Sequence, residues 1–323
     1  MGTYIAGTGR CVPDFTVTNA MLETIVDTSD DWITKRTGIK TRHLVKGETV
    51  TDIAAAACQR ALDTAKAGPN EVGLIIASTI TGDFITPALS SCIQKRLGIE
   101  SAVTLDVQAG CTGFVHALAV ADSLMQRLDI DCALVAAAEA MSRGIDWSDR
   151  RTCVLFGDGA GAVLLRKGRD GLGAAWISGK PDSDDVLTIP CNYVTHPWSP
   201  GRAEALPVLA MKGTDVYEFA CGAMVEAISE LSALQPGFLK IIPHQANGRI
   251  ISYASLKSGI PIENFYMNVQ DYANTSSASI PIALDEAWRS GWLRSGESVA
   301  LVGFGAGLTW GGIVVNWTLP DIA

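Results

Sequence analysis

Cys111 has the chemistry and the sequence position of a nucleophile. It lies between a predicted strand that ends near Val107 and a predicted helix that begins just after it. A thiol there lies near the unpaired N–H groups and the positive dipole end of the helix, and both favour the thiolate. Gly110 and Gly113 allow a ligand or another backbone segment to approach closely. Taken alone, Cys111 could also be a buried structural thiol, which is the commoner role of a free cysteine.

Two further side chains could assist a nucleophile as hydrogen-bonding groups. His244, in KIIPHQANGRI, follows an apolar strand, and the ends of parallel strands are where α/β sites usually lie. Asn274, in YANTSSASIPIALDEA, precedes a helix of small residues. Each has an ordinary alternative. The histidine could be structural, and Asn-Thr-Ser could be a turn that caps the helix.

The loop Gly303–Gly312, GFGAGLTWGG, offers backbone N–H groups without bulky side chains. Such a loop could stabilise an oxyanion, and it could equally be a tight turn between strands. The sequence contains no dinucleotide-binding fingerprint that leads into a helix and no G-x-x-x-x-G-K-[ST] phosphate loop.

Trp32, Arg36, Arg150 and Arg151 form another candidate set. Tryptophan can stack on a purine, and arginine can stack or bind phosphate. An exposed arginine beside Asp149 is more often part of a solvated ion pair.

The apolar pattern predicts an α/β fold with mainly parallel sheets, because apolar runs of strand length alternate with longer helical segments. The predicted strands are Thr3–Ala6, Leu74–Ser78, Ala102–Val107, Ala133–Ala137, Ala160–Leu165, Leu239–Ile242 and Val299–Gly303. The predicted helices are Thr18–Ile25, Asp52–Lys66, Pro87–Leu97, Gly113–Arg127, Asp215–Leu234, Asn247–Ser258 and Ser277–Trp288.

A weak internal repeat predicts two similar halves, residues 1–170 and 171–323. GDGAGAV at Gly157 is similar to GFGAGLT at Gly303, and DVQAGCT at 106–112 is similar to NVQDYANT at 268–275. The segment Gly168–Leu209 is richer in Gly, Pro, Asp and Ser, and we expect it to connect the halves as a surface excursion.

Composition excludes several classes of protein. Of 323 residues, 48% are hydrophobic and 18% charged, which rules out intrinsic disorder. The net charge of −9 argues against binding to nucleic acid. The absence of a long apolar run and of a secretion leader predicts a cytoplasmic protein with no membrane segment. None of the eight cysteines forms a C-x-x-C pair, so we expect no metal site and mostly buried thiols.

Taken together, these residues resemble the β-ketoacyl-ACP synthase III family of thiolase-fold condensing enzymes. The order and spacing of six blocks fit the family nearly from end to end, and only the segment 168–209 shows little resemblance. The blocks are TSDDWITKRTGIKTRH (28–43), AGCTGF (109–114), SDRRTCVLFGDGAGAV (148–163), PHQANGRI (243–250), NTSSASIPIALDEA (274–287) and FGAGLTWG (304–311).

The resemblance implies a duplicated, five-layered αβαβα fold, a homodimer and the triad Cys111, His244 and Asn274. Cys111 would hold an acyl group from acyl-CoA as a thioester, with backbone N–H groups of Cys111 and Ala306 as the oxyanion hole. His244 and Asn274 would stabilise the enolate formed when malonyl-ACP loses CO2. The products would be 3-ketoacyl-ACP, CoA and CO2, with no metal or redox cofactor.

The third triad residue separates this chain from related families. Elongating ketosynthases of this fold have a second histidine where Asn274 stands, and thiolases use a second cysteine. Type III polyketide synthases share Cys-His-Asn, but they are longer and do not resemble TSDDWITKRTGI.

The resemblance also implies binding residues for CoA and for the carrier protein. Trp32 and Arg150 would sandwich the adenine, Arg36 would lie near the phosphates, and Asn247 would touch the pantetheine arm. The two residues that would face the acidic carrier protein are Arg249 and Lys257.

The sequence departs from the family pattern at the acyl pocket and the docking surface. Many members carry a bulky aromatic residue at Thr86 that reaches into the partner's acyl pocket, so we expect a roomier pocket here. Ala306 replaces a glycine, and Leu308 replaces a phenylalanine that borders the pocket. Glu218 replaces a lysine and Leu256 adjoins Lys257, which weakens the expected basic docking surface.

Two alternatives to condensation stay open at this stage. A synthase-III-like acyltransferase would keep acyl-Cys111 but pass the acyl group to a non-malonyl acceptor. A catalytically inactive scaffold is the other alternative, and the complete triad argues against it.

Overall fold

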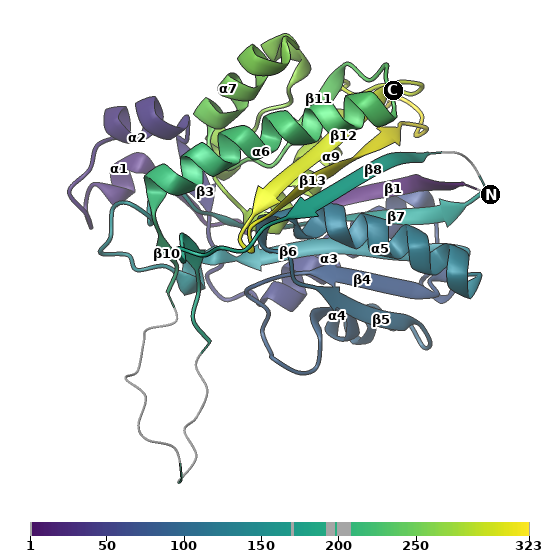
Figure 1. The fold of residues 1–323 in the computed structure, drawn as a ribbon. Helices are drawn as coiled ribbons and strands as arrows, with labels where there is room; N and C mark the ends of the chain where they lie inside the picture. The colour runs from purple at the N-terminus through teal and green to yellow at the C-terminus, as the bar shows by residue number, and fades with distance from the viewer. Residues whose placement is uncertain (1, 169–170, 192–197, 199–207, 323) are drawn as a thin grey trace.

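The computed structural model describes residues 2–168, 171–191, 198 and 208–322, and two β-sheets form its core (Figure 1). The first sheet contains, in spatial order, β1 (Thr3–Cys11), β7 (Asp158–Lys167), β6 (Cys132–Ala140), β4 (Leu74–Ser78) and β5 (Val103–Val107). The second sheet contains β11 (Lys240–Pro243), β12 (Ser298–Gly305), β13 (Thr309–Asn316) and β8 (Leu172–Gly179). Two small sheets pair β2 (Thr16–Thr18) with β3 (Thr41–His43), and β9 (Leu187–Thr188) with β10 (Ala210–Met211).

Helices and sheets alternate in five layers. Between the two sheets lie α5 (Gly113–Leu128) and α9 (Ser279–Arg289). The outer face of the first sheet is covered by α3 (Val50–Ala65) and α4 (Leu89–Leu97). The outer face of the second sheet is covered by α6 (Gly213–Leu234) and α7 (Gly248–Ser258).

Shorter elements build one end of the molecule and the turns. The helices α1 (Asn19–Leu22), α2 (Asp30–Thr37) and α8 (Val269–Tyr272) contribute to a separate hydrophobic cluster at this end. The 3-10 turns are η1 (Pro69–Glu71), η2 (Gly110–Thr112), η3 (Met141–Gly144), η4 (Ile262–Asn264) and η5 (Ser276–Ala278).

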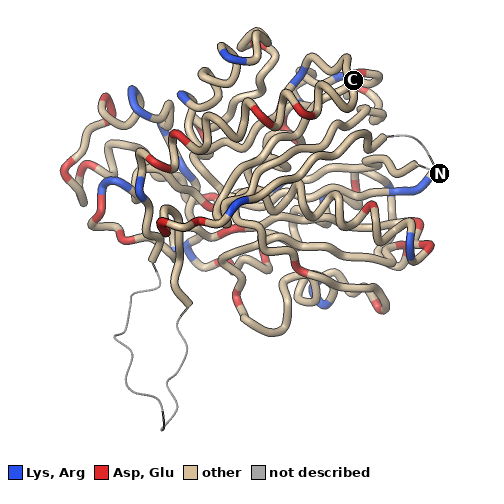
Figure 2. The backbone as a smooth tube through the Cα atoms, viewed as in Figure 1, with Lys and Arg blue, Asp and Glu red and all other residues tan. Residues whose placement is uncertain are grey.

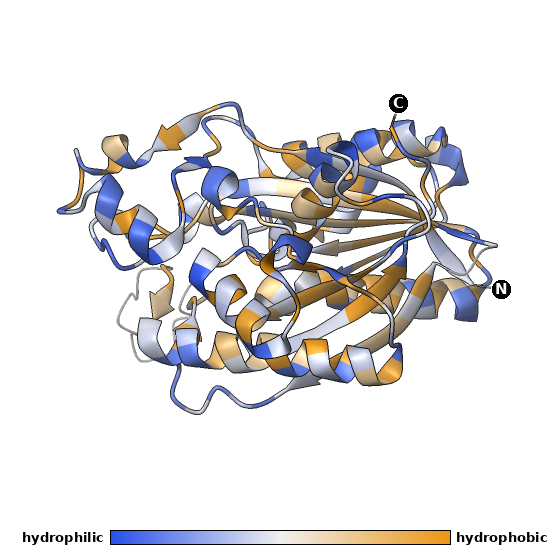
Figure 3. Cartoon of the chain, turned by 90° about the horizontal axis from the view of Figure 1, so that it is seen from above, coloured by the Kyte–Doolittle hydropathy of each residue, from blue (hydrophilic) through white to orange (hydrophobic). Residues whose placement is uncertain are grey.

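The sequence explains these layers through its apolar runs. Every residue of β4 and β6 is buried, because helices cover both faces of the first sheet. Figure 3 shows hydrophobic residues on the strands at the centre of the molecule, and Figure 2 shows charged residues mainly on the outer helices and connections. Helix α3 begins at a capping box in which Thr49 and Asp52 satisfy each other's backbone N–H groups.

The prediction of mainly parallel sheets is wrong. Three of the seven pairings in the two large sheets are parallel, and four are antiparallel. For example, β12 and β13 form a hairpin, which forces an antiparallel pair. Continuous apolar runs report burial of both faces of a sheet, and they do not report strand direction.

The segment 168–209 is only partly a connection. Residues 172–179 form β8, which pairs with β13 in the second sheet, so this part of the prediction is wrong. Residues 169–170, 192–197 and 199–207 of the predicted excursion lie outside the described residues. Helix α2, which carries Trp32 and Arg36, was not predicted because its apolar positions are few.

Four of the eight cysteines are buried: Cys58, Cys132, Cys153 and Cys221. Within the described ranges, no helix is long and apolar enough to cross a bilayer. The same ranges contain no group of three or more His, Cys, Asp or Glu arranged to hold a metal ion.

Candidate active site

The backbone around Cys111 is packed closely against the loop that follows β12. Cys111 lies in η2, directly before α5. A Cβ atom added at Gly305 would lie 2.6 Å from Cys111 N, and one added at Gly110 would lie 3.0 Å from Ala306 N. Glycine at both positions is therefore required for this approach, which places the backbones of Cys111 and Ala306 side by side.

The Cys111 thiol donates a hydrogen bond to Ser276 Oγ at 3.5 Å. Part of its surface borders a cavity, but the surrounding protein desolvates the thiol, and this burial raises its pKa to about 12. The hydrogen bond to Ser276 lowers the pKa, and the nearby Glu139 raises it. Burial therefore acts against the thiolate, whereas the position at the start of a helix favours it.

His244 is buried and held on three sides. Its backbone N–H donates to Val302 O at 2.7 Å, and its ring meets Phe304 edge-to-face at 5.1 Å. Its Nδ1 lies 2.6 Å from Ser279 Oγ, which also accepts the N–H of Gln245 at 3.2 Å. The Ser279 hydroxyl hydrogen is thus available to Nδ1, which favours the tautomer protonated at Nε2. Burial lowers the pKa of the imidazole to about 3, so the ring is neutral near pH 7.

Asn274 is fixed by a backbone bridge to the first half of the chain. Its N–H donates to Leu155 O at 2.9 Å, and its carbonyl accepts the N–H of Gly157 at 3.0 Å. The side-chain Oδ1 accepts the N–H of Ser276 at 2.8 Å. Because Oδ1 is occupied, the amide Nδ2 is the group of this side chain that can donate to a ligand.

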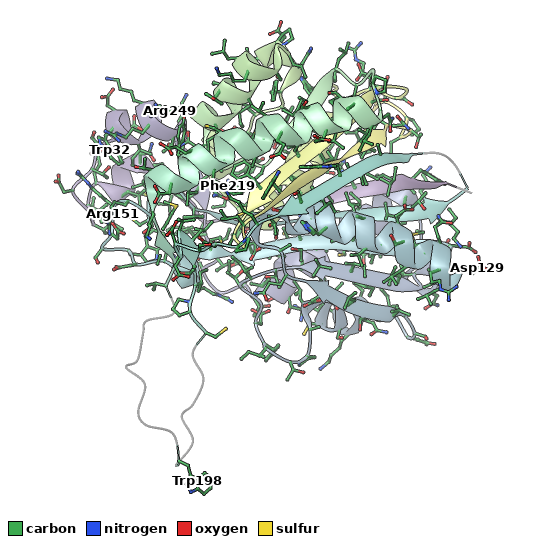
Figure 4. All side chains as sticks on the ribbon, in the orientation of Figure 1. Trp32, Asp129, Arg151, Trp198, Phe219 and Arg249 are labelled. Carbon is green, nitrogen blue, oxygen red and sulfur yellow. The ribbon has the colours of Figure 1, made fainter. Side chains whose placement is uncertain are left out.

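Cys111, His244 and Asn274 line one cavity of about 730 Å³. A second cavity of about 650 Å³ shares part of its wall with the first, including Asn274 and Phe304. The second cavity leads outward past Trp32 and Arg249, which lie at the same end of the molecule as Arg151 (Figure 4). The two cavities together can receive a long substrate whose reacting group reaches Cys111.

The predicted CoA-binding residues lie around the second cavity with one exception. Trp32, Arg36 and Asn247 line it, and Asn247 Nδ2 donates to Arg36 O at 3.2 Å. Arg151 lines this cavity and Arg150 does not. The Arg150 guanidinium instead lies 5.3 Å from the Trp32 ring centre and donates to Asp27 O at 2.7 Å.

The predicted acyl-pocket residues do not line the cavity within this single chain. Leu308 is buried and its backbone exchanges hydrogen bonds with Lys180, but it is not among the residues that line either cavity. Thr86 is exposed, and its neighbour Ile85 borders the cavity. Ala306 does line the cavity beside Cys111.

The predicted docking residues lie on α7. Arg249 lines the second cavity with its guanidinium 5.6 Å from the Tyr217 ring centre, and Lys257 lies two turns further along the helix. Glu218 is exposed on the neighbouring helix α6.

Three residues next to the triad were not predicted: Glu139, Ser276 and Ser279. Glu139 is a lone carboxyl group in the otherwise apolar run CALVAAAEA, and that interruption was a usable signal. The serines stand in NTSSAS, where polar residues are common as helix caps, so nothing in the sequence marked them out.

Comparison with known proteins identifies the family. The model for 3-oxoacyl-[acyl-carrier-protein] synthase III matches residues 105–184, and the model for its C-terminal part matches residues 239–317. A β-ketoacyl-[acyl-carrier-protein] synthase III of Clostridium acetobutylicum is 41% identical over 319 residues, which cover 97% of this chain and 98% of that protein. The chain belongs to the 3-oxoacyl-[acyl-carrier-protein] synthase III family.

Solved structures agree with this assignment to the synthase III family. The synthase III of Aquifex aeolicus VF5 has a TM-score of 0.90 and 38% identity, covering 98% of this chain and all of that one. The priming β-ketosynthase of the R1128 polyketide pathway has a TM-score of 0.90 and 34% identity, and the match covers 99% of this chain and 97% of that one. The predicted resemblance, the thiolase-like α/β fold and a condensing enzyme of the acyltransferase type are thus confirmed.

Proposed function

We propose that this synthase III condenses an acyl-CoA with malonyl-ACP, releasing CO2 and CoA and giving 3-ketoacyl-ACP. The observation that carries the proposal is the single cavity that Cys111, His244 and Asn274 share, joined to the outer cavity lined by Trp32 and Arg249. A thioester suits this site because it is activated for attack and persists until the second substrate binds.

In the first half-reaction, Cys111 Sγ forms a bond to the acyl carbon and the C–S bond to CoA breaks. The tetrahedral oxyanion lies in the space beside the backbones of Cys111 and Ala306, whose N–H groups act as donors. In a desolvated site such donors are worth several kcal/mol, of the order of 3 kcal/mol each.

In the second half-reaction, the thioester oxygen of malonyl-ACP accepts hydrogen bonds from His244 Nε2 and Asn274 Nδ2. These bonds stabilise the enolate that forms when the carboxylate leaves as CO2. The enolate carbon attacks acyl-Cys111, and Sγ departs with the electron pair. With its pKa lowered by burial, His244 is neutral, and the tautomer protonated at Nε2 has the hydrogen that this donation requires.

Substrate binding is proposed to follow the outer cavity. Trp32, Arg36 and Asn247 would contact CoA, and Arg150 would cover the adenine after leaving its present place over Trp32. Because Arg151 borders the cavity, it is a further candidate for the CoA phosphates.

Arg249 and Lys257 are proposed to face the carrier protein. They are eight residues apart on α7, so they share one face of the helix, and both are exposed. The acidic Glu218 on α6 weakens the positive charge of this surface, which reduces its attraction for an acidic carrier protein.

A homodimer is proposed because β5 is an edge strand with exposed apolar side chains. Val103 and Leu105 are 44% and 42% exposed, and Phe84 and Ile85 in the loop after β4 are 61% and 81% exposed. A free, apolar strand edge normally requires cover. We also propose that the halves 1–170 and 171–323 are structural repeats, since each contributes one sheet and one central helix.

The test of the proposed function is the intact mass of the protein after exposure to a panel of acyl-CoAs and then malonyl-ACP. An acyl adduct that malonyl-ACP discharges as 3-ketoacyl-ACP supports condensation. An adduct that persists would contradict it and favour transfer to a non-malonyl acceptor. Failure of every acyl-CoA to form an adduct would favour the inactive scaffold.

The acyl pocket is expected to accept chains longer than acetyl, because Thr86 takes the place of a bulky aromatic residue at the dimer interface. Thr86→Phe should lower turnover with longer donors at least about tenfold relative to acetyl-CoA. Thr86→Val, which keeps the volume, is the matched control, and light scattering checks that both variants keep their oligomeric state. An unchanged donor ratio in Thr86→Phe, or a parent restricted to acetyl-CoA, would contradict the prediction.

Decarboxylation is expected to persist into moderately acid solution. An ordinary histidine becomes charged as the pH falls through about 6.5, whereas the pKa of His244 is lowered to about 3, so the ring stays neutral down to that range. We expect CO2 release from malonyl-ACP to vary less than about threefold between pH 8 and pH 5, measured in Cys111→Ala so that acylation does not contribute. A larger change in rate, in either direction, with a midpoint near pH 6.5 would show that His244 titrates normally.

A further inference from the structure

Glu139 is a fully buried carboxyl group that the proposed reaction does not use. It is the only charged residue of β6, and it is 0% exposed. Its Oε2 accepts hydrogen bonds from Thr81 Oγ1 at 2.7 Å, from Ile80 N at 3.1 Å and from Thr79 Oγ1 at 3.2 Å. No lysine or arginine forms an ion pair with it in the ranges that the structure describes. A buried carboxylate held only by neutral donors is costly, so its presence beside the site calls for a role.

The other oxygen of Glu139 is connected to the Cys111 thiol. Ser277 Oγ donates to Oε1 at 2.7 Å, and Ser276 Oγ donates to the same oxygen at 3.3 Å. Ser276 Oγ in turn accepts the thiol hydrogen of Cys111 at 3.5 Å. The three groups therefore form a chain in which every hydrogen bond has the same sense, from thiol to hydroxyl to carboxyl.

The backbone holds Ser276 in this place at some cost. Its φ is 51°, in the left-handed region that serine rarely occupies, and such residues collect at functional sites. The N–H of Ser276 donates to Asn274 Oδ1 at 2.8 Å, which ties the same residue to the triad. The conformation brings the hydroxyl between Cys111 and Glu139.

We propose that Ser276 and Glu139 carry the proton of Cys111 away during acylation. The inference rests on the proposed function only in taking Cys111 as the nucleophile. The Sγ proton passes to Ser276 Oγ, and the hydroxyl proton of Ser276 passes to Glu139 Oε1. Sγ then forms its bond to the acyl carbon, and the C–S bond to CoA breaks. Glu139 then gives its proton back through Ser276, and the departing CoA thiolate takes up one proton. The proton lost by Cys111 therefore ends on CoA, and Glu139 returns to its carboxylate form.

Two nearby titratable groups, Asp158 and His244, form hydrogen bonds with partners other than Cys111, Ser276 and Glu139. Asp158 on β7, opposite Ala140, accepts from Ser142 N and Val45 N. His244 is held through Nδ1 by Ser279. The Cys111 thiol donates its hydrogen bond to Ser276. The raised pKa of the thiol is consistent with this arrangement, because an acceptor is then needed near pH 7.

The experiment measures alkylation of Cys111 by iodoacetamide between about pH 7 and pH 9, followed by peptide mass. If the proton stays within the Cys111–Glu139 pair, the parent rate is nearly independent of pH in this range. In Ser276→Ala and in Glu139→Gln the proton must leave to solvent. We expect their rates to rise about tenfold per pH unit and to be about 10²-fold slower than the parent at pH 7.

Ser277→Ala is the matched control. It removes a hydroxyl that donates to the same oxygen of Glu139 but leaves the hydrogen bonds from Cys111 through Ser276 to Glu139 intact. The alkylation rate of this variant should therefore stay nearly independent of pH. Glu139→Asp, which restores a carboxylate, should recover part of the flat profile. Thermal unfolding of each variant identifies any that does not fold, and Ser276→Ala decides the matter if Glu139→Gln is one of them.

Two outcomes would overturn the inference. If Glu139 acts only as a neighbouring negative charge, Glu139→Gln lowers the pKa of the thiol and speeds alkylation at pH 7, the opposite sign. If Ser276→Ala keeps the flat profile of the parent, the hydroxyl carries no proton. Neither result depends on acyl-CoA. If no acyl-CoA acylates the parent but the alkylation profiles of Ser276→Ala and Glu139→Gln change as described, the proposed function is contradicted, while proton transfer from Cys111 through Ser276 to Glu139 still stands.

Discussion

Cys111→Ala is expected to abolish acylation of the protein. No acyl adduct should form with any acyl-CoA, and release of free CoA should fall at least about 10³-fold, because the bond that holds the acyl group no longer has its sulfur atom. Alanine removes little volume beside the cavity, so the fold should persist. The measurement is intact mass together with the initial rate of thiol release.

Cys92→Ala is a suitable control for this prediction. Cys92 lies on α4, is partly exposed and does not line either cavity, so its removal should leave the adduct unchanged. The exposed Cys191 does border the cavity that Cys111, His244 and Asn274 line. Peptide mapping of the parent adduct distinguishes acylation of Cys191 from acylation of Cys111. An adduct that survives in Cys111→Ala would remove Cys111 from the mechanism.

His244→Ala is expected to stop condensation while leaving acylation largely intact. The imidazole is a donor to the malonyl thioester in the second half-reaction, and loss of one such donor costs about 10²–10³ in rate. CO2 release and 3-ketoacyl-ACP formation should fall by that factor. The acyl adduct on Cys111 should still form, at a rate within about threefold of the parent.

Two companion variants make this result specific. Asn274→Ala removes the second donor to the same oxygen and should show the same split between half-reactions. Ser279→Ala removes the hydroxyl that holds Nδ1, and a smaller loss is expected because Nε2 itself stays in place. Equal loss of acylation and condensation in His244→Ala would show that its role has been assigned wrongly.

The sequence determined most of the helices and of the buried strands. The run Gly113–Arg127 predicted α5 to within one residue, because its apolar spacing and the flanking glycine mark both the face and the start of the helix. The prediction was less successful where a turn sets the direction. A strand buried on both faces is a continuous apolar run, whether a hairpin or a crossover connects it to the next strand. The four antiparallel pairings could therefore not be distinguished from parallel ones in the sequence.

The sequence also nominated Cys111, His244 and Asn274, since each follows a strand or precedes a helix and their motifs resemble those of one family. Only the tertiary structure showed that they line one cavity, because Cys111 lies more than a hundred positions from His244 and Asn274 and meets them through packing of the two halves. The same packing decided the electrostatics. Burial raises the pKa of the Cys111 thiol and lowers that of His244, and burial depends on the surrounding layers rather than on neighbours in the chain. For the same reason the chain from Cys111 through Ser276 to Glu139 was not visible in the sequence, where these residues lie in three separate blocks.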